Sequence, residues 1–344
     1  EIYMGDWSSD VCSSDLARLD PTATNPAATA DGAGPLRLLQ IGLEAGCASD
    51  DVLEALDELI ATRRLGEVLD LLGTDDGGAA ETLRAHLERA DAIRSVLLEE
   101  PVDLAAAERY LSTLGTGAAA AMLDALAISE SQDTRRVILA RLVQLGDDIA
   151  DELAARLPSV PWYVQRNLLA LLVRCRRLPP TFSAREWAEH TEVSVRYPAL
   201  QIMLRSSADR EDGVHRALGD PDPRIVRLGL DGAQRSLPRQ AVTRVLMLAS
   251  APGRPLEVRT RAIELLQQVN TSMARDWLLT RVVAKRTLLR GERLHPKSPE
   301  LLAALRVLAA TWADDPKAAR AFRLVLQSGD AELLAAATRL EASR

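Results

Sequence analysis

An apolar motif returns every 30 to 32 residues through the second half of the chain. Its first position is occupied in turn by Thr134, Val164, Val195, Val226 and Val258. The fourth residue after each is apolar (Ile138, Leu168, Ala199, Leu230, Ala262), and so is the eighth in four units of five (Leu142, Leu172, Met203, Leu266, but Gln234). Spacings of four and eight residues lie on one face of a helix. A fixed period of this length is typical of stacked helical repeats.

Three of the five units also predict where their first helix begins. Pro161, Pro223 and Pro255 stand three residues before the motif, and proline suits the first turn of a helix because its missing N–H has no partner to lose there. Asp222 precedes one of these prolines and predicts a cap. We expect the second helix of each unit at residues 149–157, 183–190, 210–218, 239–248 and 274–283. Such short helices cannot bury an apolar stripe alone, so consecutive hairpins should stack.

Two stretches carry the phrases of a known repeat class. They are Pro161-Trp162-Tyr163-Val164-Gln165-Arg166-Asn167 and Asp220-Pro221-Asp222-Pro223-Arg224-Ile225-Val226-Arg227. Both resemble the opening of the first helix in bacterial HEAT-like repeats, and the resemblance covers about residues 118–344. It implies an all-α fold, a right-handed α-solenoid of HEAT-like helical hairpins. It implies no particular function, because such repeats serve many unrelated binding tasks.

The remaining segments differ in composition. Residues 5–16 resemble one reading frame of a widely used sequencing adapter, so we expect residues 1–16 to be non-native and the chain to be a C-terminal fragment of something longer. Residues 17–35 predict a flexible lead-in, residues 36–130 an acidic irregular helical-repeat region, and residues 131–344 the HEAT-like array. A basic insertion with Lys285, Arg286, Arg290, Arg293 and Lys297 interrupts the array.

The residue directly after the motif's first position is basic in four units. It is Arg135, Gln165, Arg196, Arg227 or Arg259. In HEAT-like repeats such an arginine commonly bonds an acidic residue near the start of a neighbouring helix, and Asp133, Glu192, Asp222 and Glu257 are suitable partners. The other interpretation is a cationic strip that binds an acidic partner. The sequence leaves both open.

An aromatic pair and a cation mark the start of one first helix. Trp162 and Tyr163 either fill the groove between repeats or, with Arg166, form a contact patch, because aromatic residues and arginine make most interface hot spots. We expect Trp187, Trp277 and Trp312 to lie in the core. As binding residues the sequence nominates Trp162, Tyr163, Arg166, Arg196, Arg227 and Arg259.

The distribution of charge along the chain suggests one competing function, nucleic-acid binding. Residues 1–130 hold 8 Lys+Arg and 25 Asp+Glu, whereas residues 131–344 hold 34 and 24. A basic helical array could follow a phosphate backbone. However, the array has only three lysines, Lys285, Lys297 and Lys317, and its arginines alternate with acidic residues along the sequence.

Signals of catalysis are poor. The four histidines are scattered, the phosphate-binding and nucleophile motifs are missing from the sequence, and we expect no catalytic residue, metal or cofactor. No apolar run is long enough to cross a bilayer, and two cysteines beyond Cys12 suit a cytoplasmic protein. We therefore expect a non-catalytic scaffold or regulatory module that binds another protein. The alternatives are a nucleic-acid-binding protein and the regulatory arm of a truncated multidomain signalling protein or enzyme.

Overall fold

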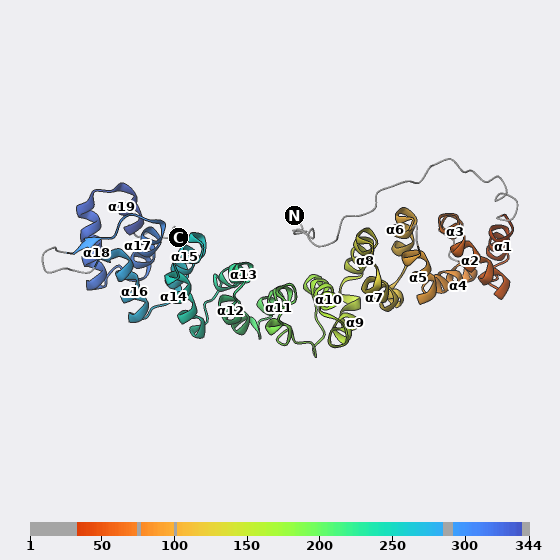
Figure 1. Cartoon of the computed structure of the whole chain (residues 1–344), viewed down its shortest axis with the longest axis horizontal. Helices are drawn as coiled ribbons and strands as arrows, with labels where there is room; N and C mark the ends of the chain where they lie inside the picture. Colours follow the sequence, from red (N-terminus) through yellow and green to blue (C-terminus); the bar gives the residue numbers. More distant parts are fainter. Residues whose placement is uncertain (1–32, 74–76, 100–101, 285–291, 339–344) are drawn as a thin grey trace, which may run out of the picture. The chain divides into compact units, whose positions relative to one another are not determined.

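The described part of the chain is almost entirely helical (Figure 1). The computed structural model describes residues 33–73, 77–99, 102–284 and 292–338. The adapter-like segment and most of the expected lead-in lie outside these residues. The chain divides into two compact units, Glu1–Val137 and Ile138–Arg344, and the division falls within helix α8, Gln132–Leu145. The expectation of an all-α fold is confirmed for the described residues.

The first unit is built from short helices joined by tight turns. They are α1 (Ala33–Glu44), α2 (Asp50–Ala61), α3 (Leu65–Leu72), α4 (Gly78–Leu87), α5 (Ala90–Leu98), α6 (Leu104–Thr113), the 3-10 turn η1 (Thr116–Ala118) and α7 (Ala119–Ile128). Helix α2 packs against α1, α3, α4 and α5, while α3 also packs against α6, and α5 against α7. Their facing sides hold leucine and alanine, with Tyr110 fully buried and its hydroxyl donating to the carbonyl of Leu87.

The second unit continues with paired helices. After α8 come η2 (Gly146–Ile149), α9 (Ala150–Arg156), η3 (Leu157–Ser159), α10 (Trp162–Arg174), η4 (Trp187–Glu189), α11 (Val193–Arg205), α12 (Arg210–Leu218), α13 (Pro223–Ala233), η5 (Arg239–Ala241), α14 (Val242–Ser250), α15 (Leu256–Leu265), η6 (Leu266–Gln268), α16 (Ser272–Val282), β1 (Val283–Ala284), β2 (Arg293–Leu294), α17 (Pro299–Thr311), α18 (Pro316–Ser328) and α19 (Ala331–Ala337). None of the described helices is long and apolar enough to cross a lipid bilayer.

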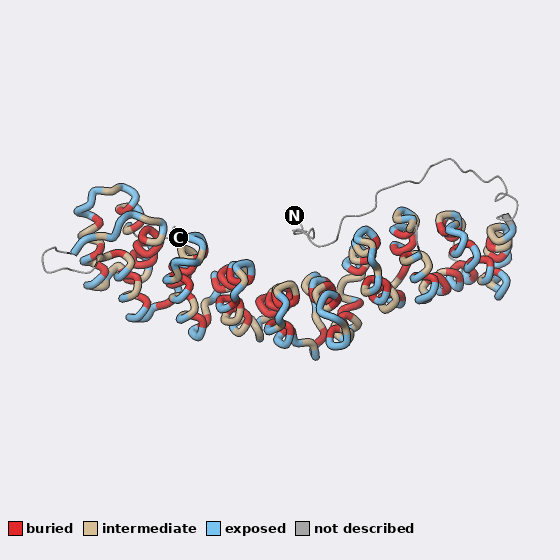
Figure 2. The backbone as a smooth tube through the Cα atoms, in the orientation of Figure 1, coloured by how far each residue is buried: buried red, intermediate tan, exposed pale blue. Residues whose placement is uncertain are grey.

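The first helices of successive repeats lie side by side within the second unit. Helices α10, α11, α13, α15 and α17 form a row in which each packs against the next. On the other side α12 packs against α14, and α16 against α18. Buried residues line the surfaces where neighbouring helices face one another, and exposed residues lie on the outward sides (Figure 2).

The apolar motif is the buried stripe of these first helices. All five residues at its first position, all five at its fourth and the four apolar ones at its eighth are at most 4% exposed. Gln234, the polar exception, is exposed. The spacing therefore predicted the core positions correctly. Prolines also stand where helices begin: Pro223 is the first residue of α13, and Pro161 and Pro255 directly precede α10 and α15.

One expectation about secondary structure was wrong. Residues 183–190 were expected to form a helix, but only the three residues of η4 are helical, because the ring of Trp187 stacks on Phe182 (centroids 5.7 Å apart) and holds the segment in a compact turn. Beside the basic insertion, β1 and β2 form an antiparallel pair in which Val283 faces Leu294. Both side chains pack against the apolar core.

The approach of α13 to α12 requires a glycine. A Cβ at Gly229 would lie 2.9 Å from Ala217 Cβ and from the backbone nitrogen of Leu218. We predict that Gly229→Ala lowers the free energy of unfolding by about 1–3 kcal/mol, because the helices must move apart. The matched change Gly253→Ala, which places its Cβ more than 4 Å from any other group, should stay within about 0.5 kcal/mol. Urea unfolding of both variants tests this, and equal losses would contradict it.

The cap of α13 makes stability depend on pH. Burial of Asp222 disfavours its charge, but hydrogen bonds from the side chain and backbone N–H of Arg224 outweigh this and hold its pKa below the usual value. A lowered pKa stabilises the fold above the unfolded pKa, near 4, and this contribution is lost as pH falls through the folded pKa.

Asp222→Asn separates this charge from the cap, since asparagine also caps helices well. We predict that the variant is less stable than the wild type at neutral pH. The difference should shrink as the pH falls below about 4, the unfolded pKa of aspartate. Unfolding in urea at a series of pH values measures it. A difference that does not change with pH would show that the carboxylate charge is unimportant.

Candidate functional site

Two aromatic side chains stand exposed at the start of α10. Trp162 and Tyr163 are the first two residues of the helix, 43% and 46% exposed. Their rings meet edge to face, with centroids 6.0 Å apart and planes at 85°. Burying these large aromatic side chains in the core would have stabilised the fold, so their exposure marks a candidate binding surface.

Arg166 completes this cluster one turn further along. Its guanidinium carbon lies 6.0 Å from the centroid of the Trp162 ring, at the outer limit of a cation–π contact. Its Nε donates to the Oδ1 of Asn167 at 3.4 Å, and Asn167 is buried. We call Trp162, Tyr163 and Arg166 the α10 patch. The structure brings these three predicted residues together, and their exposure disfavours the alternative in which both rings fill a groove between repeats.

The other tryptophans within the described residues differ from Trp162. Trp187 and Trp312 are buried in the core, as the sequence predicted. Trp277 is only partly buried, and it packs against the core of the second unit. Exposure at Trp162 is therefore a property of its position at the beginning of α10.

Arg196 is a structural residue. It is 8% exposed, as is Asp220, and its Nε and Nη2 donate to the two carboxylate oxygens at 2.9 and 3.1 Å. Its Nη1 donates to the carbonyls of His190 and Thr191, directly before its own helix. The hydrogen bond with Asp220 outweighs burial and raises the pKa of Arg196. The arginine thus joins the start of α11 to the loop before α13.

Arg259 repeats this arrangement in a later unit. It donates to Glu300 Oε1 from Nε at 3.1 Å and from Nη2 at 2.7 Å, and to the carbonyls of Pro252 and Arg254 before its own helix. Burial opposes ionisation of Glu300, but Arg259 outweighs it and lowers the pKa of the carboxyl group. For Arg196 and Arg259 the geometry fits the interpretation in which the arginine bonds an acid near the start of a neighbouring helix, although their partners are residues other than the acids the sequence suggested.

The remaining members of the series are less uniform. Arg227 is the outward-facing one: its side chain is 47% exposed, and its contact with Glu257 is 3.8 Å long. Arg135 donates to the carbonyls of Ser129 and Glu130, and Gln165 to that of Leu157. The six nominated residues therefore do not form one site. The α10 patch is a cluster, and the three arginines each pair with a different acid.

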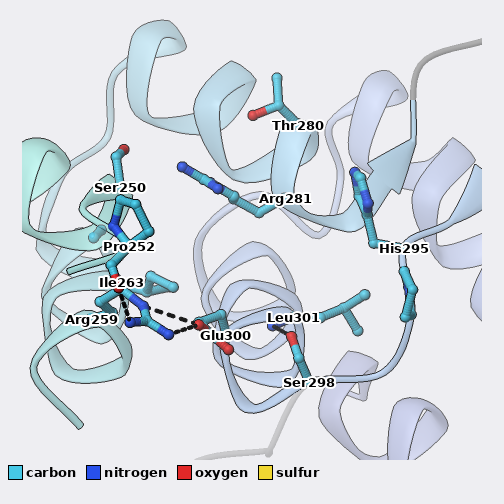
Figure 3. A pocket seen from close by; sticks show the side chains of 12 residues that line it. Ser250, Pro252, Arg259, Ile263, Thr280, Arg281, His295, Ser298, Glu300 and Leu301 are labelled. Carbon is cyan, nitrogen blue, oxygen red and sulfur yellow. Dashed lines mark hydrogen bonds and ion pairs between the residues drawn. The ribbon is translucent and has the colours of Figure 1, made fainter. Parts of the chain in front are cut away.

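A cavity that the sequence did not predict lies in the second unit. Its volume is about 440 Å³, and it is bounded by α14, α15, α16, the segment after β2 and the start of α17 (Figure 3). Ile263 and Leu301 supply apolar lining, and Ser250 and Thr280 supply hydroxyls. Arg259 and Glu300 face it as the ion pair described above.

Arg281 is the unusual side chain of this cavity. Its guanidinium carbon lies 4.8 Å from the centroid of the Trp277 ring, and Trp277 is held by a hydrogen bond from its Nε1 to Ser250 Oγ at 3.1 Å. Arg281 makes no hydrogen bond or ion pair with any residue that the structure describes, and its Nε is buried. In Figure 3 it extends across the cavity on the side of Ser250. The only sequence signal was the four-residue spacing of Trp277 and Arg281 on one helix face.

Groups that could hold a metal are not assembled in the described ranges. No three His, Cys, Asp or Glu side chains there lie close enough together to bind an ion. His86 contacts Asp57 at 2.7 Å, and the Nδ1 of His190 accepts from the backbone of Glu192. Of the basic insertion, Lys285, Arg286 and Arg290 lie outside the described residues, and Lys297 pairs with Asp330 and Glu332.

The two arginines of adjacent repeats allow a direct test. We predict that Arg196→Gln lowers the free energy of unfolding by about 3–5 kcal/mol, because it leaves the buried Asp220 carboxylate without its partner. Arg227→Gln at the equivalent position should change it by less than about 0.5 kcal/mol, because an exposed pair contributes little. Denaturant unfolding of both variants measures this difference. Equal losses of stability would contradict the structural role assigned to Arg196.

The chain was not placed in a family by comparison with known proteins. No model of a protein family matches it, and no curated protein matches it in sequence. The resemblance to HEAT-like repeats therefore depends on the repeat pattern of the chain itself. The function of the α10 patch has to be argued from its residues.

Proposed function

We propose that this protein is a non-catalytic, right-handed α-solenoid of HEAT-like repeats that binds another protein, and that the α10 patch makes the central contact. The exposure of Trp162 and Tyr163 side by side is the observation that carries the proposal. Tryptophan, tyrosine and arginine are the residues that dominate binding energy at protein interfaces. Their rings bury a large area on binding, and lose little side-chain freedom.

The row of first helices supports the same proposal. Because α10, α11, α13, α15 and α17 each pack against the next, they present equivalent positions at regular intervals. An extended partner would contact several repeats, with the α10 patch as its strongest point. Further exposed apolar side chains, such as Met247 and Met273, lie on the second helices α14 and α16.

Nucleic-acid binding is the competing proposal, and the ion pairs weaken it. A phosphate backbone needs cations that are available to it. Several arginines of the second unit are already paired: Arg216 with Glu189 and Asp212, Arg261 with Asp231, and Arg275 with Asp276 and Asp315. Nucleic-acid bases can nevertheless stack on exposed aromatic rings such as those of Trp162 and Tyr163. Nucleic acid is therefore one of the ligands in the binding test.

The test uses the full chain and a matched pair of variants. Immobilised wild type, the double variant Trp162→Ala/Tyr163→Ala and the control Met247→Ala are each exposed to extract of the organism that encodes the protein. The control removes an exposed apolar side chain from α14. We expect a protein that is enriched by the wild type and the control and lost from the double variant, with all three showing the same helical circular dichroism.

Affinity of the purified partner then quantifies the effect. Removal of one hot-spot side chain costs about 2 kcal/mol or more, so the double variant should bind at least about 30-fold more weakly. Equal affinity of wild type and double variant would overturn the assignment of the α10 patch. If the double variant instead loses salt-sensitive binding to single-stranded or duplex DNA or RNA, while protein binding is absent, the nucleic-acid proposal replaces this one.

A further inference from the structure

The cavity between α14 and α17 contains a cation that the fold does not neutralise. Of the charged side chains that line it, Arg259 and Glu300 neutralise each other, and Arg259 is also saturated by backbone carbonyls. His295 lies at the rim, with its backbone N–H bonded to the carbonyl of Val282. Arg281 is left with one positive charge and no hydrogen-bond or ion-pair partner among the described residues, and no dashed line joins it to the other residues drawn in Figure 3.

The surroundings of Arg281 hold it ready for a planar anion. One face of its guanidinium is covered by the Trp277 ring, which Ser250 fixes in place. Stacking leaves the edge of a guanidinium open, and this edge matches a carboxylate through two parallel N–H···O bonds. A partly buried arginine lacking an acceptor also leaves hydrogen-bonding capacity unused, so that an oxyanion would bind it without breaking an existing pair.

The cavity's size and lining restrict what carries that anion. A volume of about 440 Å³ lies within the range of small-ligand sites, roughly 300–1,000 Å³. Ile263 and Leu301 give it an apolar side away from Arg281, and Ser250 and Pro252 lie on the side toward which Arg281 extends. A single uncompensated charge matches a monoanion better than a phosphate dianion. An apolar wall favours a carboxylate attached to a compact hydrocarbon group.

We propose that this cavity is a binding site for a carboxylate on a compact branched apolar group, with Arg281 bonding the carboxylate and Ile263 and Leu301 contacting the hydrocarbon. Such a group occurs in a free small acid and at the C-terminus of a peptide that ends in leucine. The site is separate from the α10 patch and does not depend on the proposed protein-binding function.

Four probes test the chemistry on the full wild-type chain. They are N-acetyl-leucine, its neutral amide N-acetyl-leucinamide, inorganic phosphate and the peptide acetyl-Gly-Gly-Leu. The readout is the indole N–H resonance of Trp277 in a nitrogen-15 correlation spectrum, identified by its absence in Trp277→Phe. We expect saturable shifts with N-acetyl-leucine at millimolar concentrations, and at least about tenfold weaker binding of the amide, equivalent to ~1.4 kcal/mol.

The source of the carboxylate follows from the same titrations. Tighter binding of the peptide than of N-acetyl-leucine supports a chain terminus, and equal or weaker binding supports a free acid. Equal binding of the neutral amide would overturn the proposal, and so would an unshifted Trp277 resonance up to the solubility limit of N-acetyl-leucine. Tighter binding of phosphate than of either carboxylate would overturn the assignment of the anion.

Variants test the role of Arg281. Arg281→Gln should bind N-acetyl-leucine at least about tenfold more weakly, and Arg281→Lys, which retains the charge without the planar fork, should fall between the two. The control Arg293→Gln removes the same charge from an exposed position of β2, two residues from His295, and should bind as the wild type does. Undiminished binding by Arg281→Gln would overturn the proposal. If that variant fails to fold, the comparison of acid and amide on the wild type still decides.

Discussion

The α-helices in the described residues are too short to be more than marginally stable alone, so each depends on apolar contact with the helices beside it. The described α-helices span between 7 and 14 residues, and isolated helices below about 12–15 residues are marginal in water. Burial of leucine, valine and alanine between neighbours supplies what is missing. Because contacts run mainly between elements close in the sequence, the fold is a succession of local packing problems, and each is solved by the next hairpin.

Packing of this kind brings helix starts and loops together, and their polar groups need partners. Arg196 and Arg259 each bond carbonyls just before their own helix and a carboxylate further along the chain. One guanidinium thereby orders a turn and joins two repeats. The same position is exposed at Arg227, where the acid lies 3.8 Å away. The identity of the residue is repeated, but its contribution to stability is set by how deeply its partner is buried.

Functional potential lies where this packing leaves side chains unsatisfied. The α10 patch was predictable in part, because residues three and four apart on a helix are neighbours, and Arg166 stands at these spacings from Tyr163 and Trp162 near a predicted helix start. Their exposure was not predictable, since the same residues could have filled a groove between repeats. The Arg281 cavity was not foreseen at all. It is lined by five segments between residues 249 and 301, and only their packing decides that Arg281, a neighbour of Trp277 on the same helix, meets no described carboxylate.

The sequence by itself determined the helical period and the buried face of each first helix. Apolar spacing records which side of a helix leaves water, and that requirement is local, so positions from Thr134 to Leu266 were identified correctly. It failed at residues 183–190, where the stacking of Trp187 on Phe182 outweighed helical spacing. Only the tertiary structure decided which arginine pairs with which acid. Asp220 and Glu300 lie 24 and 41 residues beyond the arginines they bind, and charge–charge geometry over such separations depends on how the hairpins pack.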